Sequence, residues 1–205
     1  MATSTAQRTG IWIIAIVMTI GTLAGFIAMI LAPENEKADS SRLQKLYAEY
    51  QQKVQAQNDE LSKKYYAKIA EYKAMPASFD STSVTELTTK DLVVGDGEEI
   101  KKDTQYSAYY IGWNPKGKVF DQSIDGDKLK APIAGDNLIE GWNEGVIGMK
   151  IGGIRELTIP SAKAYKDQDK GADIPPNTPL KFILMVIPTP KEVEVPKELM
   201  QSYGG

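Results

Sequence analysis

Aromatic and branched apolar residues recur from Val119 to Phe182, in a stretch without histidine or cysteine. The chain of 205 residues contains neither residue type anywhere. Disulfides, thiolate catalysis and cysteine-based zinc sites are therefore excluded, and so is the commonest general base. Any chemistry must depend on carboxylates, tyrosines, backbone groups or the shape of a cavity. The pattern predicts an apolar pocket with a few polar groups at its rim, and no metal or cofactor.

The charge balance gives no indication of a nucleic-acid partner. Lys and Arg number 24 against 27 Asp and Glu, which is a formal net charge of −3. Proteins that bind nucleic acid generally need a basic surface to neutralise phosphates. The sequence therefore predicts no binding of nucleic acid.

An uncharged segment of 22 residues runs from Ile11 to Ala32, after a polar lead over residues 1–10 in which Arg8 is the charged side chain. About 20 apolar residues span the hydrocarbon core of a bilayer. Signal peptides usually have a shorter apolar run, of about 7–15 residues, and a small residue three positions before the cleavage site. We therefore expect a transmembrane helix over residues 11–32, with a cleaved signal peptide as the alternative.

The charges that flank this segment leave its orientation open. Arg8 lies on one side, and Lys37, Arg42 and Lys45 lie on the other. Positive residues favour the cytoplasmic side, so this count alone does not place the N-terminus inside. Because a short N-terminal lead normally stays in the cytoplasm, we expect a single-pass protein of the cell membrane with its C-terminal domain outside the cytoplasm.

Residues 33–75 are expected to form a helical stalk. The stretch from Ser40 to Ala74 has no Gly or Pro and spaces its apolar residues mostly three and four apart, as on one face of a helix. Ser40 or Ser41 is a candidate N-cap. The apolar stripe is interrupted at residues 57–58. It either packs within the chain or forms a coiled coil that makes a homodimer, and both alternatives stay open.

Residues 76–83 have the composition of a linker, and residues 84–190 are expected to form the globular domain. Here short apolar runs alternate with Gly, Pro and Asp turns, which is typical of strands. Strands are predicted at residues 104–112, 118–123, 153–159 and 180–187, with one short helix between residues 140 and 146. The predicted fold is α+β, an antiparallel sheet wrapped around one short helix. The charged tail, residues 191–205, is expected to be mobile.

The first of these strands shows a clear alternation. Residues of a strand point to opposite faces in turn, so Tyr106, Ala108 and Tyr110 should share one face. The turn at residues 114–117, Asn-Pro-Lys-Gly, should join this strand to the next as a hairpin.

Several short motifs in this domain follow one another in a recognisable order and spacing. They are Asp91–Gly97, Tyr109–Gly112, Gly117–Asp121, Leu138–Val146, Gly148–Met149, Gly152–Pro160, Ala164–Tyr165 and Ile174–Thr178. Taken together, residues 84–188 resemble the FKBP-type peptidyl-prolyl cis-trans isomerases, in a membrane-anchored form similar to bacterial ones. The resemblance covers about half of the chain and implies the FKBP-like sheet for the globular part.

The resemblance also implies a pocket for a prolyl peptide, with Trp142 as its floor. Asp121 and Tyr165 would supply polar contacts at the rim, and the backbone N–H of Ile139 would hold the carbonyl of the bound peptide. These three are the candidate catalytic residues. The pocket walls would be formed by Tyr110, Phe120, Leu129, Leu138, Ile139, Ile174 and Phe182.

The sequence departs from the family pattern at the rim of this pocket. Leu129 aligns where the family often has an aromatic residue, and Lys166 replaces the usual glycine after Ala-Tyr. No basic residue closely follows Phe120-Asp121, and the loop over residues 166–173 is charged. We expect these differences to affect substrate preference and inhibitor affinity without changing the fold.

The implied activity requires no side-chain nucleophile. Rotation about an X–Pro bond crosses a barrier of ~20 kcal/mol that amide resonance sets, and no covalent bond breaks. A dry aromatic cavity that favours the twisted amide is therefore sufficient. The expected partners are proline-containing polypeptides, among them exported or membrane proteins, and macrolide inhibitors of the family. The alternatives are a catalytically weak peptide-binding module and a holdase chaperone, dimerised through the stalk.

Overall fold

The structure is a computed structural model that describes residues 34–136 and 138–202. These residues belong to two compact units. One unit comprises residues 56–191, and the other comprises the described parts of residues 1–55 and 192–205. The predicted membrane segment, residues 11–32, lies outside the described residues. None of the helices that are described is both long enough and apolar enough to cross a membrane.

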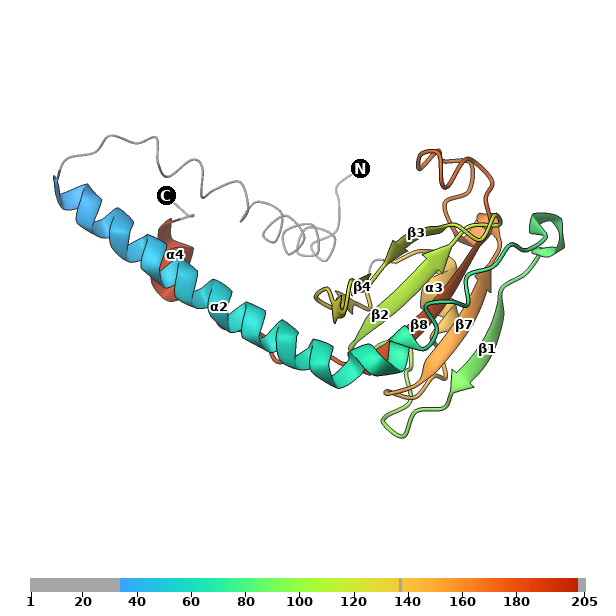
Figure 1. The fold of residues 1–205 in the computed structure, drawn as a ribbon, viewed down its shortest axis with the longest axis horizontal. Helices are drawn as coiled ribbons and strands as arrows, with labels where there is room; N and C mark the ends of the chain where they lie inside the picture. Colours follow the sequence, from blue (N-terminus) through green and yellow to red (C-terminus); the bar gives the residue numbers. More distant parts are fainter. Residues whose placement is uncertain (1–33, 137, 203–205) are drawn as a thin grey trace. The chain divides into compact units, whose positions relative to one another are not determined.

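Six strands of the unit over residues 56–191 form one antiparallel sheet (Figure 1). They are β1 (Thr88–Val93), β2 (Tyr106–Trp113), β3 (Val119–Gln122), β6 (Ile133–Ala134), β7 (Ile154–Ile159) and β8 (Leu180–Pro188). Their order is β1-β7-β8-β2-β3, and β6 pairs with β2 as well. Strands β4 (Ile124–Asp125) and β5 (Lys128–Leu129) form a separate small hairpin between β3 and β6.

Helical elements accompany this sheet along the chain. They are α2 (Glu34–Ala70), α3 (Glu140–Gly145), α4 (Lys197–Ser202) and the 3₁₀ turns Ser81–Ser83 and Ser161–Lys163. The turn at residues 114–117 joins β2 to β3, as expected, with Gly117 at a φ of 77°. The antiparallel sheet with the short helix α3 confirms the predicted α+β fold.

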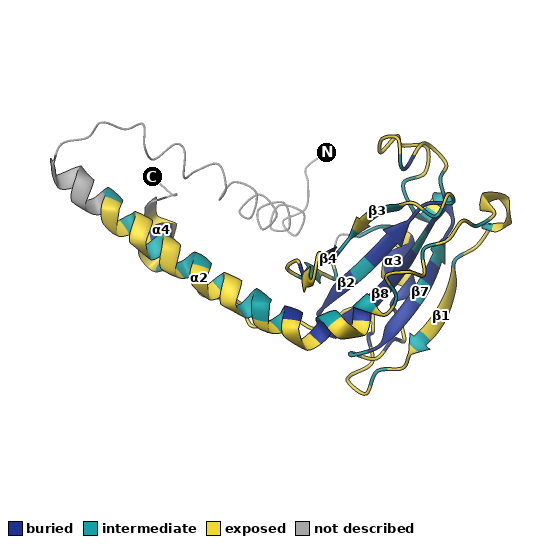
Figure 2. Cartoon of the chain, in the orientation of Figure 1, coloured by how far each residue is buried: buried dark blue, intermediate teal, exposed yellow. Residues whose placement is uncertain are grey.

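One face of the sheet packs against helix α3. Tyr106 and Ala108 of β2 lie in a buried apolar layer that also holds Trp142 and Val146 of α3. Tyr110 packs on the same layer, which confirms the alternation predicted for β2. Figure 2 shows that β2, β7 and β8 are mostly buried along their length. This layer is where a pocket between helix and sheet can form.

The opposite face of the sheet packs against the end of helix α2. Tyr109 and Ile111 of β2 lie in a second buried layer, together with Tyr65 and Ile69 of α2. Ile69 is completely buried. The last turns of α2 are therefore part of the domain core, whereas the sequence placed them in a stalk outside it.

Helix α3 approaches strand β7 closely through two glycines one turn apart. A Cβ added to Gly141 would lie 2.3 Å from Ile159 Cγ2, and one added to Gly145 would lie 2.7 Å from Leu157 Cδ2. Side chains at these positions would force the helix away from the sheet, because protein interiors are close-packed. The two glycines thus set the height at which Trp142 sits above the sheet.

The bounds of α2 differ from those expected. The helix begins at Glu34, so Ser40 and Ser41 lie inside it and neither is the N-cap. The helix ends at Ala70 rather than Ala74 and is followed by a turn.

Residues 76–83, expected to be a linker, are tied to the turn between β2 and β3. Ser78 forms a β-bridge with Lys116. The Phe79 N–H donates to the Pro115 carbonyl at 3.0 Å, and Trp113 Nε1 donates to the Ala77 carbonyl at 3.2 Å. These bonds hold the segment beside the sheet, whereas a flexible linker would not be held in one position.

In the other unit, the tail forms helix α4 in the segment for which the sequence predicted mobility. Arg42 Nη2 lies 3.1 Å from Glu198 Oε1, and Leu199 is buried. Burial, and then the carboxylate of Glu192, raise the pKa of Tyr50 on α2. These contacts favour packing of the stripe on α2 within the chain, and the coiled-coil dimer stays a prediction.

A tyrosine hydroxyl is left without a partner in the layer under α2. Tyr109 is fully buried, and its hydroxyl has no hydrogen-bond partner among the described residues. Its ring lies 6.1 Å from the ring of Tyr65. Burial, and then Tyr65, raise the pKa of Tyr109 from 10.0 to about 12.

We expect Tyr109→Phe to raise the free energy of unfolding by about 1 kcal/mol at pH 7, because an unpaired buried polar group costs about 1–3 kcal/mol. The raised pKa of Tyr109 means that the folded state resists ionisation, so the wild type should lose stability as the pH rises above 10. The variant should lose less over that range. Urea titrations at pH 7 and above pH 10 measure these free energies of unfolding. Tyr72→Phe is the control, and its free energy of unfolding should differ little from that of the wild type. A less stable Tyr109→Phe protein would contradict the prediction.

Candidate active site

A cavity of about 300 Å³ opens on the α3 side of the sheet. Strands β2, β3, β6 and β8 contribute to its walls, together with α3 and the loops that precede and face it. Its lining consists of Tyr110, Phe120, Asp121, Ile133, Leu138, Ile139, Trp142, Tyr165 and Phe182. The cavity is thus mainly aromatic and aliphatic, with Asp121 as its charged side chain among the lining residues.

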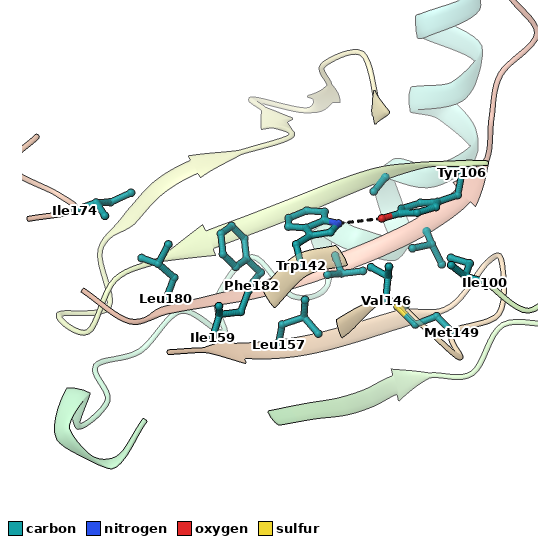
Figure 3. Packing of buried hydrophobic residues seen from close by; sticks show 13 residues of the cluster. Ile100, Tyr106, Trp142, Val146, Met149, Leu157, Ile159, Ile174, Leu180 and Phe182 are labelled. Atoms are coloured by element: carbon teal, nitrogen blue, oxygen red, sulfur yellow. Dashed lines mark hydrogen bonds between the residues drawn. The ribbon is translucent and has the colours of Figure 1, made fainter. Parts of the chain in front are cut away.

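Trp142 forms the floor of the cavity and is fixed from two sides. Its indole Nε1 donates to the Tyr106 hydroxyl at 3.3 Å, as Figure 3 shows. Its ring packs edge-on against Phe182, at 5.3 Å between centroids, and against Tyr110, at 5.6 Å. With its only polar atom satisfied, the indole presents an apolar surface to any ligand.

Phe120 and Phe182 form one wall, and a glycine makes room for them. Their rings lie 5.6 Å apart at an interplanar angle of 83°, an edge-to-face arrangement. A Cβ on Gly112 of β2 would lie 2.7 Å from Phe182 Cε1 and 2.8 Å from Phe120 Cζ. The absence of a side chain at this position therefore allows both rings to reach the cavity.

Asp121 is held at the rim by hydrogen bonds. One carboxylate oxygen accepts the Tyr110 hydroxyl, and the other accepts the Gln122 N–H at 2.8 Å. Burial, and then the bond and charge of Asp121, raise the pKa of Tyr110 well above its usual value, so the phenol stays protonated. Lys130 Nζ lies 3.8 Å from Asp121 Oδ1. The basic residue that the sequence did not show close to Phe120-Asp121 is thus supplied after the β4–β5 hairpin.

Two hydrogen-bond donors at the cavity have no partner among the described residues. One is the backbone N–H of Ile139, the residue before helix α3, whose carbonyl caps the helix by accepting from Trp142 N at 3.0 Å. The other is the hydroxyl of Tyr165. Burial, and then Asp121, raise the pKa of Tyr165, so this hydroxyl remains a donor at neutral pH. Both donors are available to the carbonyl oxygen of a ligand.

Lys166 takes the backbone conformation that a glycine would adopt more easily. Its φ is 58°, in the left-handed region, where a side chain costs free energy. The Lys166 N–H donates to the Ser161 carbonyl at 2.9 Å, and its own carbonyl accepts from Asn177 N at 2.7 Å. The loop thus keeps Tyr165 at the cavity despite the departure from Gly. Lys170 Nζ lies over the Tyr165 ring, 5.2 Å from its centroid.

The structure brings most of the predicted site residues together, and two lie elsewhere. Leu129 does not line the cavity: it is buried in the layer under α2, and its N–H donates to Ser62 Oγ at 2.8 Å. Ile174 is buried in the same layer as Trp142 but does not line the cavity, and Figure 3 shows it at the Leu180 end of that cluster. The residues brought together are Tyr110, Phe120, Asp121, Leu138, Ile139, Trp142, Tyr165 and Phe182.

Sequence reasoning missed Ile133, which lines the cavity. Ile133 pairs with Ala108 across β6 and β2, and directly paired residues project from the same face of a sheet. The signal was therefore the alternation of β2, which already placed Ala108 on the cavity side. Placing Ile133 from this alternation also requires the register between β2 and β6, and the sequence of a two-residue strand does not reveal that register.

A second cavity, of about 420 Å³, has Tyr106 in its lining. It is bordered by the loop over residues 101–105 and by Asp136, Asn143 and Ile147. Charged and amide side chains border much of this space, and it lacks the ring of aromatic residues found around Trp142. The described residues hold no cluster of three or more carboxylates that could bind a metal ion.

Comparison with known proteins identifies the family. The model of the FKBP-type peptidyl-prolyl cis-trans isomerases matches residues 96–187. The FK506-binding protein of Neisseria meningitidis serogroup A is 40% identical over 97 residues, which are 47% of this chain and 89% of that protein. A probable FK506-binding protein of Corynebacterium glutamicum is 38% identical over 104 residues, which are 50% of this chain and 86% of that protein. The chain belongs to the family of FKBP-type peptidyl-prolyl cis-trans isomerases, as its motifs predicted.

Some relatives are much longer. The 39 kDa FK506-binding nuclear protein of Drosophila melanogaster is 40% identical over 109 residues, which are 52% of this chain but 30% of that protein. The chain therefore spans less than a third of that relative, and the similarity concerns the isomerase domain.

We expect Gly112→Ala to lower the free energy of unfolding by about 1–3 kcal/mol, because overpacking a close-packed layer strains it by this amount. The added methyl would press on the rings of Phe120 and Phe182. Combining it with Phe120→Leu should recover part of the loss, since the smaller side chain leaves room. Urea denaturation measures both variants. A Gly112→Ala protein as stable as the wild type would show that the two rings are not held as described.

Proposed function

We propose that this chain accelerates cis-trans rotation of X–Pro bonds in polypeptides and that it does so without covalent catalysis. The observation that carries this proposal is the cavity itself. It combines an apolar aromatic floor and walls with two donors, the Ile139 N–H and the Tyr165 hydroxyl, that have no partner in the described part of the chain. A prolyl ring fits such walls, and its preceding carbonyl needs one or two donors.

The mechanism follows from the electronic change during rotation. A planar amide is polar because resonance transfers charge from nitrogen to oxygen, and this resonance is lost at the twist. The apolar surface of Trp142, Phe120 and Phe182 disfavours the planar, strongly solvated form relative to the twisted one. The prolyl ring packs against these aromatic rings and stays fixed, while the carbonyl that precedes it turns toward a hydrogen-bond donor.

The polar residues have separate roles in this proposal. The Ile139 N–H donates a hydrogen bond to the carbonyl oxygen. The Tyr165 hydroxyl donates either to this oxygen in the rotated state or to the neighbouring carbonyl. Asp121 fixes the Tyr110 ring through the hydrogen bond between them and places a negative charge at the rim. None of these roles transfers a proton, which is consistent with the raised pKa of both tyrosines.

Tyr165→Phe tests the role of the hydroxyl. We expect kcat/KM for a short X–Pro peptide to fall about three- to tenfold, the effect of one neutral hydrogen bond. The assay follows cis-to-trans exchange with the full chain, and Tyr72→Phe is the matched control. Peptide binding without any rate enhancement by the wild type would favour the peptide-binding module instead. Suppression of client aggregation that survives Trp142→Ala would favour the holdase.

The names of the relatives motivate a ligand proposal for the same cavity. Several of them are named as FK506-binding proteins, and we propose that this cavity also accepts macrolides of that type. The rim differs from the family pattern at Lys166 and in the charged loop over residues 166–173, so affinity is expected to be set there. Competition between macrolide and peptide in the isomerase assay measures it.

We further propose that residues 11–32 anchor the chain in the cell membrane and that its clients are exported or membrane proteins. The support is the 22-residue uncharged run in the sequence. The expected result is that the chain stays with membranes after alkaline carbonate washing, whereas a variant with two Lys residues placed at positions 20 and 23 is released. Protease added outside the cell should then reach the isomerase domain. Release of the unmodified chain by carbonate would contradict the anchor.

A further inference from the structure

Helix α2 holds the small hairpin of β4 and β5 at two points. The hydroxyl oxygen of Ser62 accepts a hydrogen bond from Leu129 N at 2.8 Å. One turn further along the helix, the Tyr66 hydroxyl donates to the Gly126 carbonyl at 3.2 Å. Ser62 and Leu129 are both buried, so this bond is protected from competing water. The hairpin is thus fixed at its tip and at its return strand.

The same hairpin is bonded to the residues at the rim of the active site. The Lys130 N–H, next to Leu129, donates to the Ser123 carbonyl at 2.8 Å. The buried Ser123 in turn exchanges two bonds with Tyr110: its N–H donates to the Tyr110 carbonyl at 2.8 Å, and its hydroxyl accepts from Tyr110 N at 2.9 Å. Tyr110 then donates its hydroxyl to Asp121.

A second connection runs through the side chain of Lys130. Its Nζ donates to the Gln122 carbonyl at 2.9 Å and lies 3.8 Å from Asp121 Oδ1. This ion pair is exposed and contributes little by itself. Its geometry nevertheless depends on where the hairpin returns to the sheet, which is the point that Ser62 fixes.

We propose that Ser62 and Tyr66 of α2 are positioning residues of the isomerase site: they fix the β4–β5 hairpin and, through Ser123 and Lys130, orient the Tyr110–Asp121 pair at the rim of the cavity. The family match begins at residue 96, so both residues lie outside the part of the chain that the family defines. A segment on the far face of the sheet thus takes part in shaping the cavity. The proposal rests on the proposed isomerase function for its catalytic consequence, although not for its structural one.

The test compares Ser62→Ala and Tyr66→Phe with the wild-type full chain in a mild detergent. Each variant removes one hydrogen bond to the hairpin, and no residue that lines the cavity is substituted. We expect kcat/KM to fall about three- to tenfold in Ser62→Ala, mostly through kcat, and about two- to threefold in Tyr66→Phe, whose bond is exposed. Tyr72→Phe removes a hydroxyl in the turn that follows the same helix and should leave the rate unchanged.

A cycle with Asp121→Asn shows whether the effect passes through the rim. If it does, Ser62→Ala should cost much less in the Asp121→Asn background than in the wild type. Equal costs in both backgrounds, or a wild-type rate in Ser62→Ala, would overturn the positioning role.

Amide NMR gives a readout that does not depend on activity. The Gln122 N–H donates to Asp121 Oδ1, so its chemical shift reports where the carboxylate lies. We expect this signal to move in both variants and the Leu129 amide to exchange faster in Ser62→Ala. Unchanged Gln122 and Leu129 signals would overturn the proposal. A wild-type protein without isomerase activity would contradict the proposed function, while the NMR signals would still decide whether α2 orients Asp121.

Discussion

Strand β2 is buried on both faces, and the rest of the domain depends on this. Its even-numbered residues Tyr106 and Ala108 belong to the apolar layer under α3. Its odd-numbered residues Tyr109 and Ile111 belong to the layer under α2. A strand with two apolar faces needs cover on both sides. Helix α3 supplies it on the side of the cavity, and the end of α2 supplies it on the other.

In the proposed mechanism, the cavity acts through its shape and its hydrogen-bond donors. The side chains around it are uncharged aromatic and aliphatic groups apart from Asp121, which already accepts two hydrogen bonds. Trp142 is fixed by Tyr106 and by its aromatic neighbours, so little of its freedom is lost when a ligand binds. In this proposal, rotation about a bond depends on rigid apolar walls and an N–H donor at the cavity.

The sequence predicted the parts of the site that regular alternation and local motifs determine. Tyr110 follows from the period of β2, and Trp142, Leu138 and Ile139 lie in one motif at the start of α3. Leu129 was wrongly placed because the β4–β5 hairpin interrupts the run between β3 and β6, and across such an interruption the face of a residue does not follow from its spacing. The role of α2 was missed for a different reason: its stripe resembles that of any amphipathic helix, and only the tertiary structure shows which surface it covers.

The position of β8 has a consequence for the order in which the domain is made. This last strand, Leu180–Pro188, lies in the middle of the sheet, between β7 and β2. Until the ribosome has released it, β2 and β7 have no common neighbour, and both apolar layers lack their centre. The central pairing of the domain therefore joins segments far apart in the chain, and such non-local pairing is slow to form. An isomerase of this topology must itself complete a long-range closure before its cavity exists.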